Sequence, residues 1–419
     1  MESFRFVHAA DLHIDSPFAG IGDADNRVAT RLREATYEAF QNLVNLCINQ
    51  KADFLVIAGD VYDGADRSVR AQLRFRDGIS RLAAAGIQSF VVHGNHDPLD
   101  GWQSSISWPE GVHIFGVTPE WKNFEKNGEV VAAVQGMSYP TREVTDNLAI
   151  RFSPPESSNI FAIGLLHANV GANSAHPNYA PCTVEDLSES GIDYWALGHV
   201  HTRQTLKRAA PVIAYPGNIQ GRHPNEVGAR GALVVDVDPS GASRSEFVAL
   251  DVVRWERSEV DISNIETIDS LDSAIRQATD NLSAQAEDRD VVCRLNLVGR
   301  GSLHEQLAAG GAVEDLLDAV RGTWSGGGSP WVWVERIVDS TRPAIDIESR
   351  AKQDDFLGAT LKRALLSSIE ADEINRLTEA VSDVYSGRRH GLDKPSEEQV
   401  SAWAEEARWY LAELLEQGK

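Results

Sequence analysis

Five short, nearly continuous apolar runs are distributed over the first half of the chain. They cover residues 4–10, 54–58, 89–93, 160–166 and 194–197. Runs of this length without an alternating polar face are typical of strands that are buried on both sides of a sheet. The pattern therefore predicts the central strands of an α/β domain.

The segments between these runs change to a helical period. Apolar positions in residues 31–50 recur every three to four residues, which predicts an amphipathic helix. These positions are Leu32, Ala35, Ala39, Leu43 and Leu46. A second helix is predicted at 68–85, and later strands at 130–136, 212–215 and 232–237. The series predicts an α/β fold with two packed β-sheets flanked by helices.

The pattern changes again after residue 245. Residues 250–342 hold three strand-like stretches and two helical segments, which predict a small α+β domain. From residue 345 onward, the chain is helical in pattern and rich in charge. We therefore predict three parts, namely a large α/β domain, an α+β domain and a helical C-terminal region, at residues 1–245, 246–344 and 345–419.

The last predicted helix begins at a capping box, Ser396-Glu397-Glu398-Gln399. In such a box, a serine and a glutamine three residues later satisfy backbone N–H groups at the helix start. The apolar face of this helix contains Trp403, Ala407, Tyr410, Leu411 and Leu414. Two interpretations stay open: the face packs on the chain's own core, or it docks a partner protein.

Composition narrows the class of protein. With 42% hydrophobic residues among 419, the chain can bury a sizeable core. No apolar stretch of about 18 residues occurs, so no membrane span is expected. The first residues begin a strand and lack the basic and apolar regions of a signal peptide. Three widely spaced cysteines indicate buried thiols in a reducing compartment, so we expect a cytoplasmic protein.

Each of the five predicted buried strands ends at residues that can bind metal ions. The motifs are Asp11-Leu12-His13, Gly59-Asp60-Val61-Tyr62-Asp63, Gly94-Asn95-His96-Asp97, His167 and Gly198-His199-Val200-His201. Ligand sites in α/β sheets lie beyond the carboxyl ends of the strands. We therefore expect these five motifs to form one site.

Seven side chains in these motifs offer nitrogen or oxygen ligands. They are Asp11, His13, Asp60, Asn95, His167, His199 and His201. Seven ligands are too many for one ion, but they suit two ions that share a carboxylate and activate water for in-line attack at phosphorus. Mixed imidazole and oxygen ligands favour transition metals over Ca²⁺. We expect two divalent ions, with Mn²⁺ as the first choice and Fe²⁺ or Zn²⁺ as alternatives.

The order of these motifs over roughly the first 220 residues resembles the calcineurin-like metallophosphoesterase superfamily. Residues 6–13, Tyr215-Pro216-Gly217-Asn218 and Gly221-Arg222-His223 are most similar to the SbcD-type DNA repair exonucleases, and Asn218 to their YhaO-like branch. The resemblance implies a four-layer fold followed by a small capping domain. It also implies two ligand sets that share Asp60: Asp11, His13, Asp60 and His201 for one ion, and Asp60, Asn95, His167 and His199 for the other.

Further roles are implied by the same resemblance. His96 would protonate the leaving oxygen or stabilise charge there, and Asp63 would hold the His96 ring. The alternative for Asp63 is a loop carboxylate that caps backbone amides. Arg222 and His223 can grip a substrate phosphate, or they belong to an ordinary surface loop. Two more carboxylates are candidates to orient ligating histidines, Asp15 and Asp97.

The resemblance implies a dinuclear-metal phosphodiesterase that acts as a DNA exonuclease subunit. Its partner would be an SMC-like ATPase, whose coiled-coil root binds the C-terminal helices. One alternative is a metallophosphoesterase acting on nucleotides or other small phosphoesters. Another is a DNA-end-binding scaffold with secondary metal chemistry, which the intact ligand set disfavours. Assembly as a homodimer is left open.

The charge balance limits how this chain can hold DNA. Its 39 Lys and Arg residues against 62 Asp and Glu residues give a formal net charge of −23. Proteins that bind duplex DNA by its phosphates usually carry a basic patch or a basic overall balance. We therefore expect either basic residues clustered near the site or a partner that supplies DNA affinity.

Overall fold

A computed structural model of the chain describes residues 1–16, 26–64, 68–101, 106–157, 159–171, 178–322, 330–367, 375–380 and 395–417. The chain divides into two compact units. Unit 1 comprises Met1–Arg257, Thr279–Arg294 and Trp324–Glu335, and unit 2 comprises Ser258–Ala278, Leu295–Thr323 and Arg336–Lys419. Among the described residues, no helix has the length and apolar character needed to cross a membrane.

Unit 1 contains two six-stranded sheets, with strand orders β12-β11-β1-β2-β3-β4 and β5-β6-β7-β8-β10-β9. The five predicted buried strands are β1 (Phe4–Ala9), β2 (Phe54–Ala58), β3 (Gln88–Val92), β7 (Phe161–His167) and β8 (Tyr194–Gly198). In the first sheet, β1, β2 and β3 are parallel neighbours, as are β7 and β8 in the second. The carboxyl ends of the parallel strands therefore lie at the same end of each sheet.

The remaining strands of unit 1 complete these sheets. They are β4 (Val112–Ile114), β5 (Glu120–Lys126), β6 (Glu129–Met137), β9 (Gln204–Lys207), β10 (Val212–Tyr215), β11 (Gly231–Val237) and β12 (Ser243–Ala249). β11 and β12 run antiparallel to their neighbours in the first sheet, and β5 and β9 do so at the two edges of the second. Both sheets are therefore mixed.

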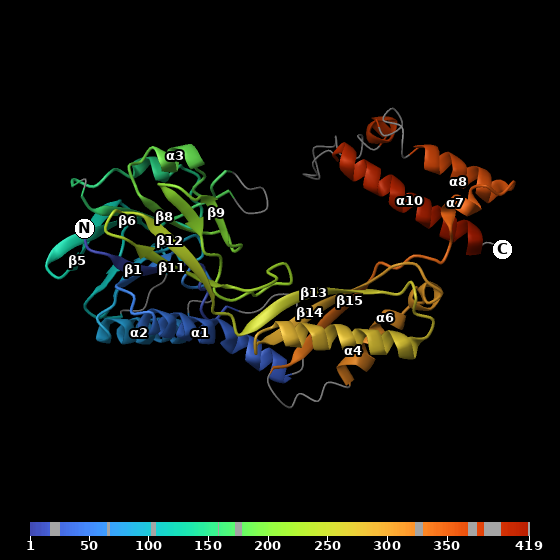
Figure 1. Ribbon diagram of the computed structural model, residues 1–419, viewed down its shortest axis with the longest axis horizontal. Coiled ribbons are helices and arrows are strands. Elements are labelled where there is room, and N and C mark those ends of the chain that lie inside the picture. Colours follow the sequence, from blue (N-terminus) through green and yellow to red (C-terminus); the bar gives the residue numbers. More distant parts are fainter. Residues whose placement is uncertain are drawn as a thin grey trace. The chain divides into compact units, whose positions relative to one another are not determined.

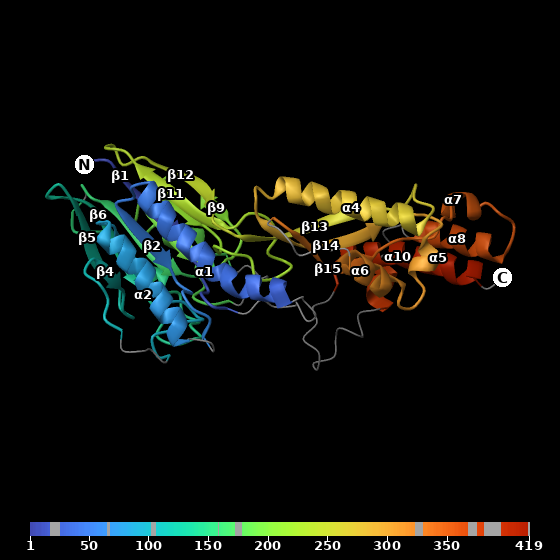
Figure 2. The ribbon, with the colours of Figure 1, turned by 90° about the horizontal axis from the view of Figure 1, so that it is seen from below.

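Helices α1 (Asn26–Asn49) and α2 (Val69–Ala84) lie side by side on the outer face of the first sheet, and α3 (Val184–Ser188) lies beyond the second (Figures 1 and 2). All five apolar positions predicted for the first helix are buried in α1. Ser68 caps α2, because its hydroxyl oxygen accepts a hydrogen bond from the N–H of Ala71 at 2.9 Å. The predicted pair of packed sheets flanked by helices is confirmed.

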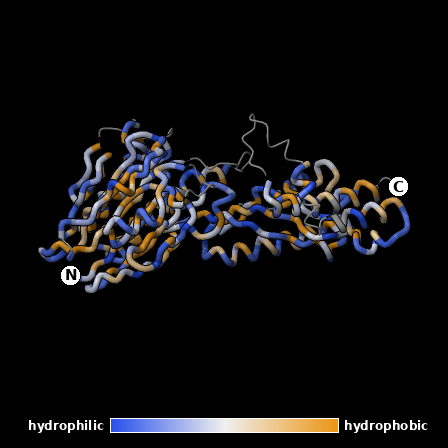
Figure 3. The backbone as a smooth tube through the Cα atoms, turned by 90° about the horizontal axis from the view of Figure 1, so that it is seen from above, coloured by the Kyte–Doolittle hydropathy of each residue, from blue (hydrophilic) through white to orange (hydrophobic). Residues whose placement is uncertain are grey.

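The space between the two sheets is filled largely by aromatic side chains. Phe6 and Phe54 stack with ring centroids 5.2 Å apart, and Tyr194 meets Phe6 edge-on at 5.2 Å. All three side chains are fully buried. Figure 3 shows hydrophobic stretches running through the strands of this part. Such a close-packed core holds the strand ends in fixed positions, which a multi-ligand site requires.

A third, three-stranded sheet has the order β13-β14-β15. Its strands are β13 (Val253–Asp261), β14 (Asp290–Val298) and β15 (Val332–Asp339). Helix α4 (Ile268–Gln285) connects the first two strands, and α5 (His304–Leu307) and α6 (Ala312–Gly322) follow β14. This arrangement confirms the α+β character predicted for residues 250–342. The boundaries of the three predicted parts stay predictions.

The C-terminal region is helical, with α7 (Ile347–Arg350), α8 (Phe356–Ser367) and α10 (Glu397–Gln417). The capping box at the start of α10 is confirmed. The Gln399 N–H donates to the Ser396 hydroxyl at 3.2 Å, and the Ser396 N–H donates to the Gln399 side-chain oxygen at 2.9 Å.

The buried face of α10 differs from the predicted one. Trp409 and Ala412 pack with Leu357 and Leu361 of α8. The predicted face is exposed instead: Trp403 is 43%, Tyr410 63% and Leu414 51% exposed. The Trp409 ring also lies 3.5 Å from the guanidinium of Arg300, a cation–π contact that helps to fix the rotation of the helix. Within the described residues, the buried cluster of α10 therefore does not include Tyr410 and Leu414.

Candidate metal centre

Strained backbone marks the strand ends that carry the predicted ligands. Asp11, His13, Asp60 and His199 all have left-handed φ values, of 51°, 43°, 52° and 97°. Such conformations cost about 1–3 kcal/mol each and cluster at functional sites. They persist here because backbone hydrogen bonds tie the loops together, with the Asp11 N–H donating to Gly59 and the His13 N–H to Asp60 at 3.1 and 3.0 Å.

The glycines of the motifs allow close approach between loops. A Cβ atom on Gly198 would lie 1.9 Å from the carbonyl oxygen of Ala58, and one on Gly94 would lie 2.3 Å from a carboxylate oxygen of Asp60. Any larger residue at either position would push apart two strand ends that meet at the site. These two glycines therefore serve the assembly of the ligands.

The first predicted ligand set converges. Nε2 of His13 lies 3.2 Å from Nε2 of His201 and 3.8 Å from Oδ2 of Asp60, while Nε2 of His201 lies 4.0 Å from Oδ1 of Asp11. The spacing of Asp11, His13 and His201 permits them to hold one ion. Two imidazole nitrogens that face each other at this distance repel unless a proton or a cation lies between them.

The second predicted ligand set converges beside the first. Oδ1 of Asn95 lies 2.9 Å from Nε2 of His167 and 3.2 Å from Nδ1 of His199. Nδ1 of His167 donates to the carbonyl of Ala58 at 2.9 Å, which turns Nε2 toward Asp60 Oδ2 at 3.4 Å. Oδ2 of Asp60 therefore faces a histidine of each set, as a bridging carboxylate must.

Electrostatics of the site suit divalent cations. Burial raises the pKa of Asp11, and it raises that of Asp60 to about 7. Burial also lowers the pKa of His13, and lowers that of His167 to about 4. The imidazoles of His13 and His167 are therefore neutral and offer lone pairs, while the buried carboxylates need a cation to stabilise their charge. Two divalent ions fit this donor set.

His96 and Asp63 form a contacting pair at the edge of the ligand cluster. Nδ1 of His96 lies 2.6 Å from Oδ1 of Asp63, and the His96 side chain is 34% exposed. Burial lowers the pKa of His96, but the hydrogen bond to Asp63 and the charges of Asp60 and Asp63 outweigh it, so the net pKa is raised. Burial opposes ionisation of Asp63, yet hydrogen bonds from His13 and His96 hold its pKa below the usual range.

The two residues predicted to grip substrate lie in different surroundings. Arg222 is partly buried, and its Nη1 lies 2.6 Å from Oδ2 of Asp63, with a further hydrogen bond to Ser16. Its charge is therefore already engaged by Asp63. His223 is exposed, and its Nδ1 accepts a hydrogen bond from the N–H of Asn225 at 3.1 Å. Substrate binding by either residue stays a prediction.

The two further carboxylates fix loops. Asp97 accepts hydrogen bonds from the backbone of Val61 at 2.8 Å and of Gly94 at 2.7 Å, and joins the loops that carry Asp60 and Asn95. The carboxylate of Asp15 binds Arg70 and Arg74 of α2 at 2.9 and 2.8 Å. The prediction that Asp15 orients a ligating histidine was wrong, because these two arginines occupy it.

Sequence reasoning assigned no role to Glu226, which contacts a predicted ligand. Its Oε1 lies 2.5 Å from Nδ1 of His201, and its Oε2 accepts from the N–H of Arg222 at 2.6 Å. In the sequence it follows Gly221-Arg222-His223, one of the segments that carry the family resemblance, by three residues. A second residue without an assigned role is Tyr139, whose buried ring meets His167 edge-on at 5.6 Å.

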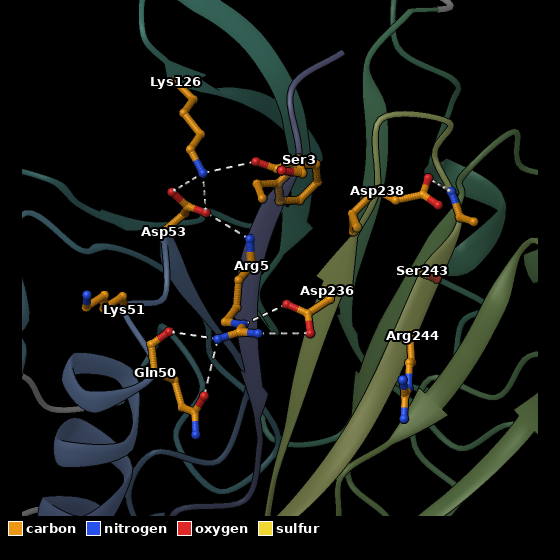
Figure 4. Close-up of a pocket in the computed structure, with 13 residues that line it drawn as sticks. Ser3, Arg5, Gln50, Lys51, Asp53, Lys126, Asp236, Asp238, Ser243 and Arg244 are labelled. Carbon is orange, nitrogen blue, oxygen red and sulfur yellow. Dashed lines mark hydrogen bonds and ion pairs between the residues drawn. The ribbon is translucent and has the colours of Figure 1, made fainter.

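A cavity of about 530 Å³ lies at the opposite end of the first sheet (Figure 4). It is lined by the start of β1 and by residues next to β2 and β11. Two ion pairs lie in its lining: Arg5 binds Asp236 at 2.6 Å, and Lys126 binds Asp53 at 3.0 Å. The cavity lies at the amino ends of the parallel strands. Ligands of α/β sheets bind at the carboxyl ends instead. It is therefore a weaker candidate than the histidine cluster.

Two family models match the chain. A model of the calcineurin-like phosphoesterases matches residues 4–203. A model described as the middle domain of metallophosphoesterase YhaO matches residues 255–342. The first match contains the seven predicted ligands, and the second spans the three-stranded sheet.

Relatives extend these matches over the whole chain. An uncharacterized metallophosphoesterase, YhaO, of Bacillus subtilis (strain 168) is 34% identical over 418 residues, which are 99% of this chain and 98% of the relative. The SbcD component of the SbcCD nuclease of the same strain is 25% identical over 296 residues, or 60% and 72% of the two chains. The DNA double-strand break repair protein Mre11 of Aeropyrum pernix is 25% identical over 300 residues, or 68% and 70%.

Proposed function

The chain belongs to the calcineurin-like metallophosphoesterase family, and on this basis we propose that it is a dinuclear-metal phosphodiesterase acting as a DNA exonuclease subunit. The observation that carries the proposal is the convergence of both ligand sets on Oδ2 of Asp60. Similarity to a nuclease component and to a DNA double-strand break repair protein supports DNA as the substrate.

Seven side chains would hold the ions. Asp11, His13, Asp60 and His201 would bind one ion, and Asp60, Asn95, His167 and His199 the other. When bound, two such ions supply a nucleophile from water at neutral pH and neutralise phosphate oxygens. Mn²⁺ is the first choice, with Fe²⁺ and Zn²⁺ as alternatives, because the ligands mix imidazole with oxygen.

His96 would give a proton to the leaving oxygen of the DNA strand. Its Nδ1 is taken by Asp63 at 2.6 Å, which leaves Nε2 as the atom that donates. The raised pKa of His96 favours the protonated imidazole that a general acid needs. Asp63 would orient the ring, and Arg222 would hold Asp63 in place through the contact at 2.6 Å.

We also propose that an SMC-like ATPase binds the C-terminal region. The exposed Trp403, Tyr410 and Leu414 of α10 offer an apolar surface for such a partner. The formal net charge of −23 supports the need for one, because the chain repels duplex DNA. The alternative substrate class is nucleotides or other small phosphoesters, which need no extended basic surface.

One assay tests the proposal against this alternative. Labelled single-stranded and double-stranded DNA and bis-p-nitrophenyl phosphate are incubated with the protein in the presence and absence of Mn²⁺. We expect Mn²⁺-dependent cleavage of the small diester and of DNA from its ends. Hydrolysis of the small diester without DNA cleavage, even with the ATPase present, would favour the small-phosphoester alternative. Absence of hydrolysis with Mn²⁺, Fe²⁺ and Zn²⁺ alike would refute both.

A further inference from the structure

The loop at residues 217–228, which follows β10, reaches the candidate metal centre with two side chains. Glu226 contacts His201 and Arg222 contacts Asp63, at 2.5 and 2.6 Å. The backbone N–H of Arg222 also donates to Glu226 at 2.6 Å, so the two contacts are coupled within the loop. This short loop therefore contacts both His201, a predicted ligand, and Asp63, which holds the predicted proton donor His96.

Glu226 fixes the orientation of a ligand. Its carboxylate takes Nδ1 of His201, which leaves Nε2 facing His13 and Asp11. A carboxylate on the far nitrogen of a ligating histidine fixes the tautomer and raises the basicity of the ligand.

The loop is itself held by the first strand of the third sheet. The indole N–H of Trp255 donates to the carbonyl of Gly221 at 3.2 Å, and the Gly228 N–H donates to the carbonyl of Trp255 at 2.9 Å. The Val252 N–H donates to the side chain of Gln220 at 2.9 Å. Hydrogen bonds therefore anchor the loop to β13 near both of its ends.

Trp255 is itself rigidly placed. Its side chain is 1% exposed and belongs to an apolar cluster with Val28 and Leu32 of α1 and Val292 of β14. A Cβ atom on Gly221 would lie 3.1 Å from the Trp255 ring, so loop and ring are in direct contact. The position of the loop is therefore set by the packing of α1 against the third sheet.

We infer that Glu226, Arg222 and Trp255 are positioning residues for the metal centre. Glu226 aligns His201 for its ion, Arg222 aligns Asp63 and through it His96, and Trp255 sets the position of the loop that carries both. This inference rests on the proposed dinuclear centre and adds that the affinity for one ion depends on the third sheet.

The test measures Mn²⁺ binding by the full-length protein. The loss of the electron paramagnetic resonance signal of free Mn²⁺ during titration counts the bound ions and gives their affinities. We expect Glu226→Gln to weaken one of two ions by about 10–100-fold and to leave the other unchanged. Trp255→Phe, which keeps an aromatic ring at this position and removes the indole N–H, should weaken the same ion by a smaller factor.

Arg222 is tested by kinetics. Lysine cannot reproduce the forked geometry of arginine. Arg222→Lys should keep both ions but lower kcat for a phosphodiester with an alkoxide leaving group, such as a dinucleotide, by about 10²-fold, the scale expected when a catalytic group is misplaced. KM should stay unchanged, because His96 would act on the leaving group and not on substrate binding.

Asp53→Asn is the matched control, because Asp53 is 18% exposed against 14% for Glu226 and lies at the opposite end of the first sheet. It should bind both ions like the parent. If both Glu226→Gln and Trp255→Phe bound Mn²⁺ with the affinities of the unsubstituted protein, the inference would be overturned. If Glu226→Gln does not fold, the result for Trp255→Phe decides. A parent that binds no Mn²⁺ would overturn the metal centre as well. A parent that binds two ions but leaves DNA intact would overturn only DNA as the substrate.

Discussion

Asp60 makes three separate contacts within the candidate site. Its Oδ1 accepts from the N–H of His96 at 2.9 Å, and its Oδ2 faces His13 and His167 at 3.8 and 3.4 Å. Its left-handed backbone directs the side chain toward both ligand sets. A single side chain therefore links the two ion positions to the loop that carries the predicted proton donor.

Asp60→Asn should abolish hydrolysis and reduce metal content. The amide retains one oxygen and loses the negative charge, so it cannot bridge two cations. Elemental analysis of the parent should show about two transition-metal ions per chain, as the dinuclear mechanism requires. The dinuclear interpretation fails if the variant keeps both ions together with full activity.

His96→Ala should separate catalysis from metal binding. The His96 ring contacts Asp63 and meets His13 edge-on at 5.0 Å, but His96 is not one of the seven predicted ligands, so both ions should be retained. Hydrolysis of a DNA strand should fall by about 10²- to 10⁴-fold, the range expected for loss of a general acid. Elemental analysis provides the check, since loss of metal from this variant would make His96 a ligand or a structural residue.

The predicted metal ligands could be picked out in the sequence because their motifs directly follow apolar runs. Glu226 and Arg222 were harder to interpret, since their partners lie 25 and 159 residues away and depend on how the loop folds back. Asp15 was misread for the same reason. Its partners Arg70 and Arg74 follow 55 and 59 residues later on α2, and nothing in the local pattern indicates them.

At the scale of elements, buried strands were predictable and polar edge strands were not. β5 and β12 carry mostly polar residues, with the sequences EWKNFEK and SRSEFVA. They are strands because β6 and β11 offer them a hydrogen-bonding edge, not because of an apolar pattern. The sequence left open which face of α10 is buried, since contacts with α8 and Arg300 decide its rotation.

Gly198→Ala should loosen the junction between β8 and β2. The added methyl group would lie 1.9 Å from the carbonyl oxygen of Ala58, so the two strand ends must separate. We expect a loss of about 1–3 kcal/mol in the free energy of unfolding, typical of overpacking. Denaturant unfolding of the metal-free protein measures it.

Gly116→Ala is the control for this variant. A Cβ atom there meets no heavy atom within 4 Å, and the backbone does not need glycine. Its free energy of unfolding should match that of the parent. If Gly198→Ala were equally harmless, the close approach of the two strand ends would not be a requirement of the fold.

For the whole molecule, the net charge and the exposed apolar surface of α10 both support binding of a partner protein. A chain with a formal net charge of −23 is poorly suited to hold duplex DNA alone, and α10 exposes Tyr410 and Leu414. Removing the entire C-terminal region would be a crude test, because Glu413 binds His304 at 3.0 Å. Substitutions on the exposed face leave this contact in place.

The double variant Tyr410→Ser, Leu414→Ser should lose binding to an SMC-like ATPase while hydrolysing bis-p-nitrophenyl phosphate like the parent. Both side chains are more than half exposed, so folding should be little affected. Recovery of the ATPase in a pull-down measures the effect, with Glu398→Ala at the start of the same helix as the control. Equal recovery by the double variant and the parent would remove this face from consideration.

The left-handed backbone at four of the predicted ligands bears on how descendants of this chain can diverge. Glycine at Asp11, His13, Asp60 or His199 would relieve about 1–3 kcal/mol of strain at each position and remove a ligand at the same time. Selection for a stable fold alone would therefore erode these residues before the sheets that carry them. Without selection for catalysis, descendants of this chain would become more stable and lose the metal ligands. Continued selection for catalysis would retain the complete set of ligands that this chain has.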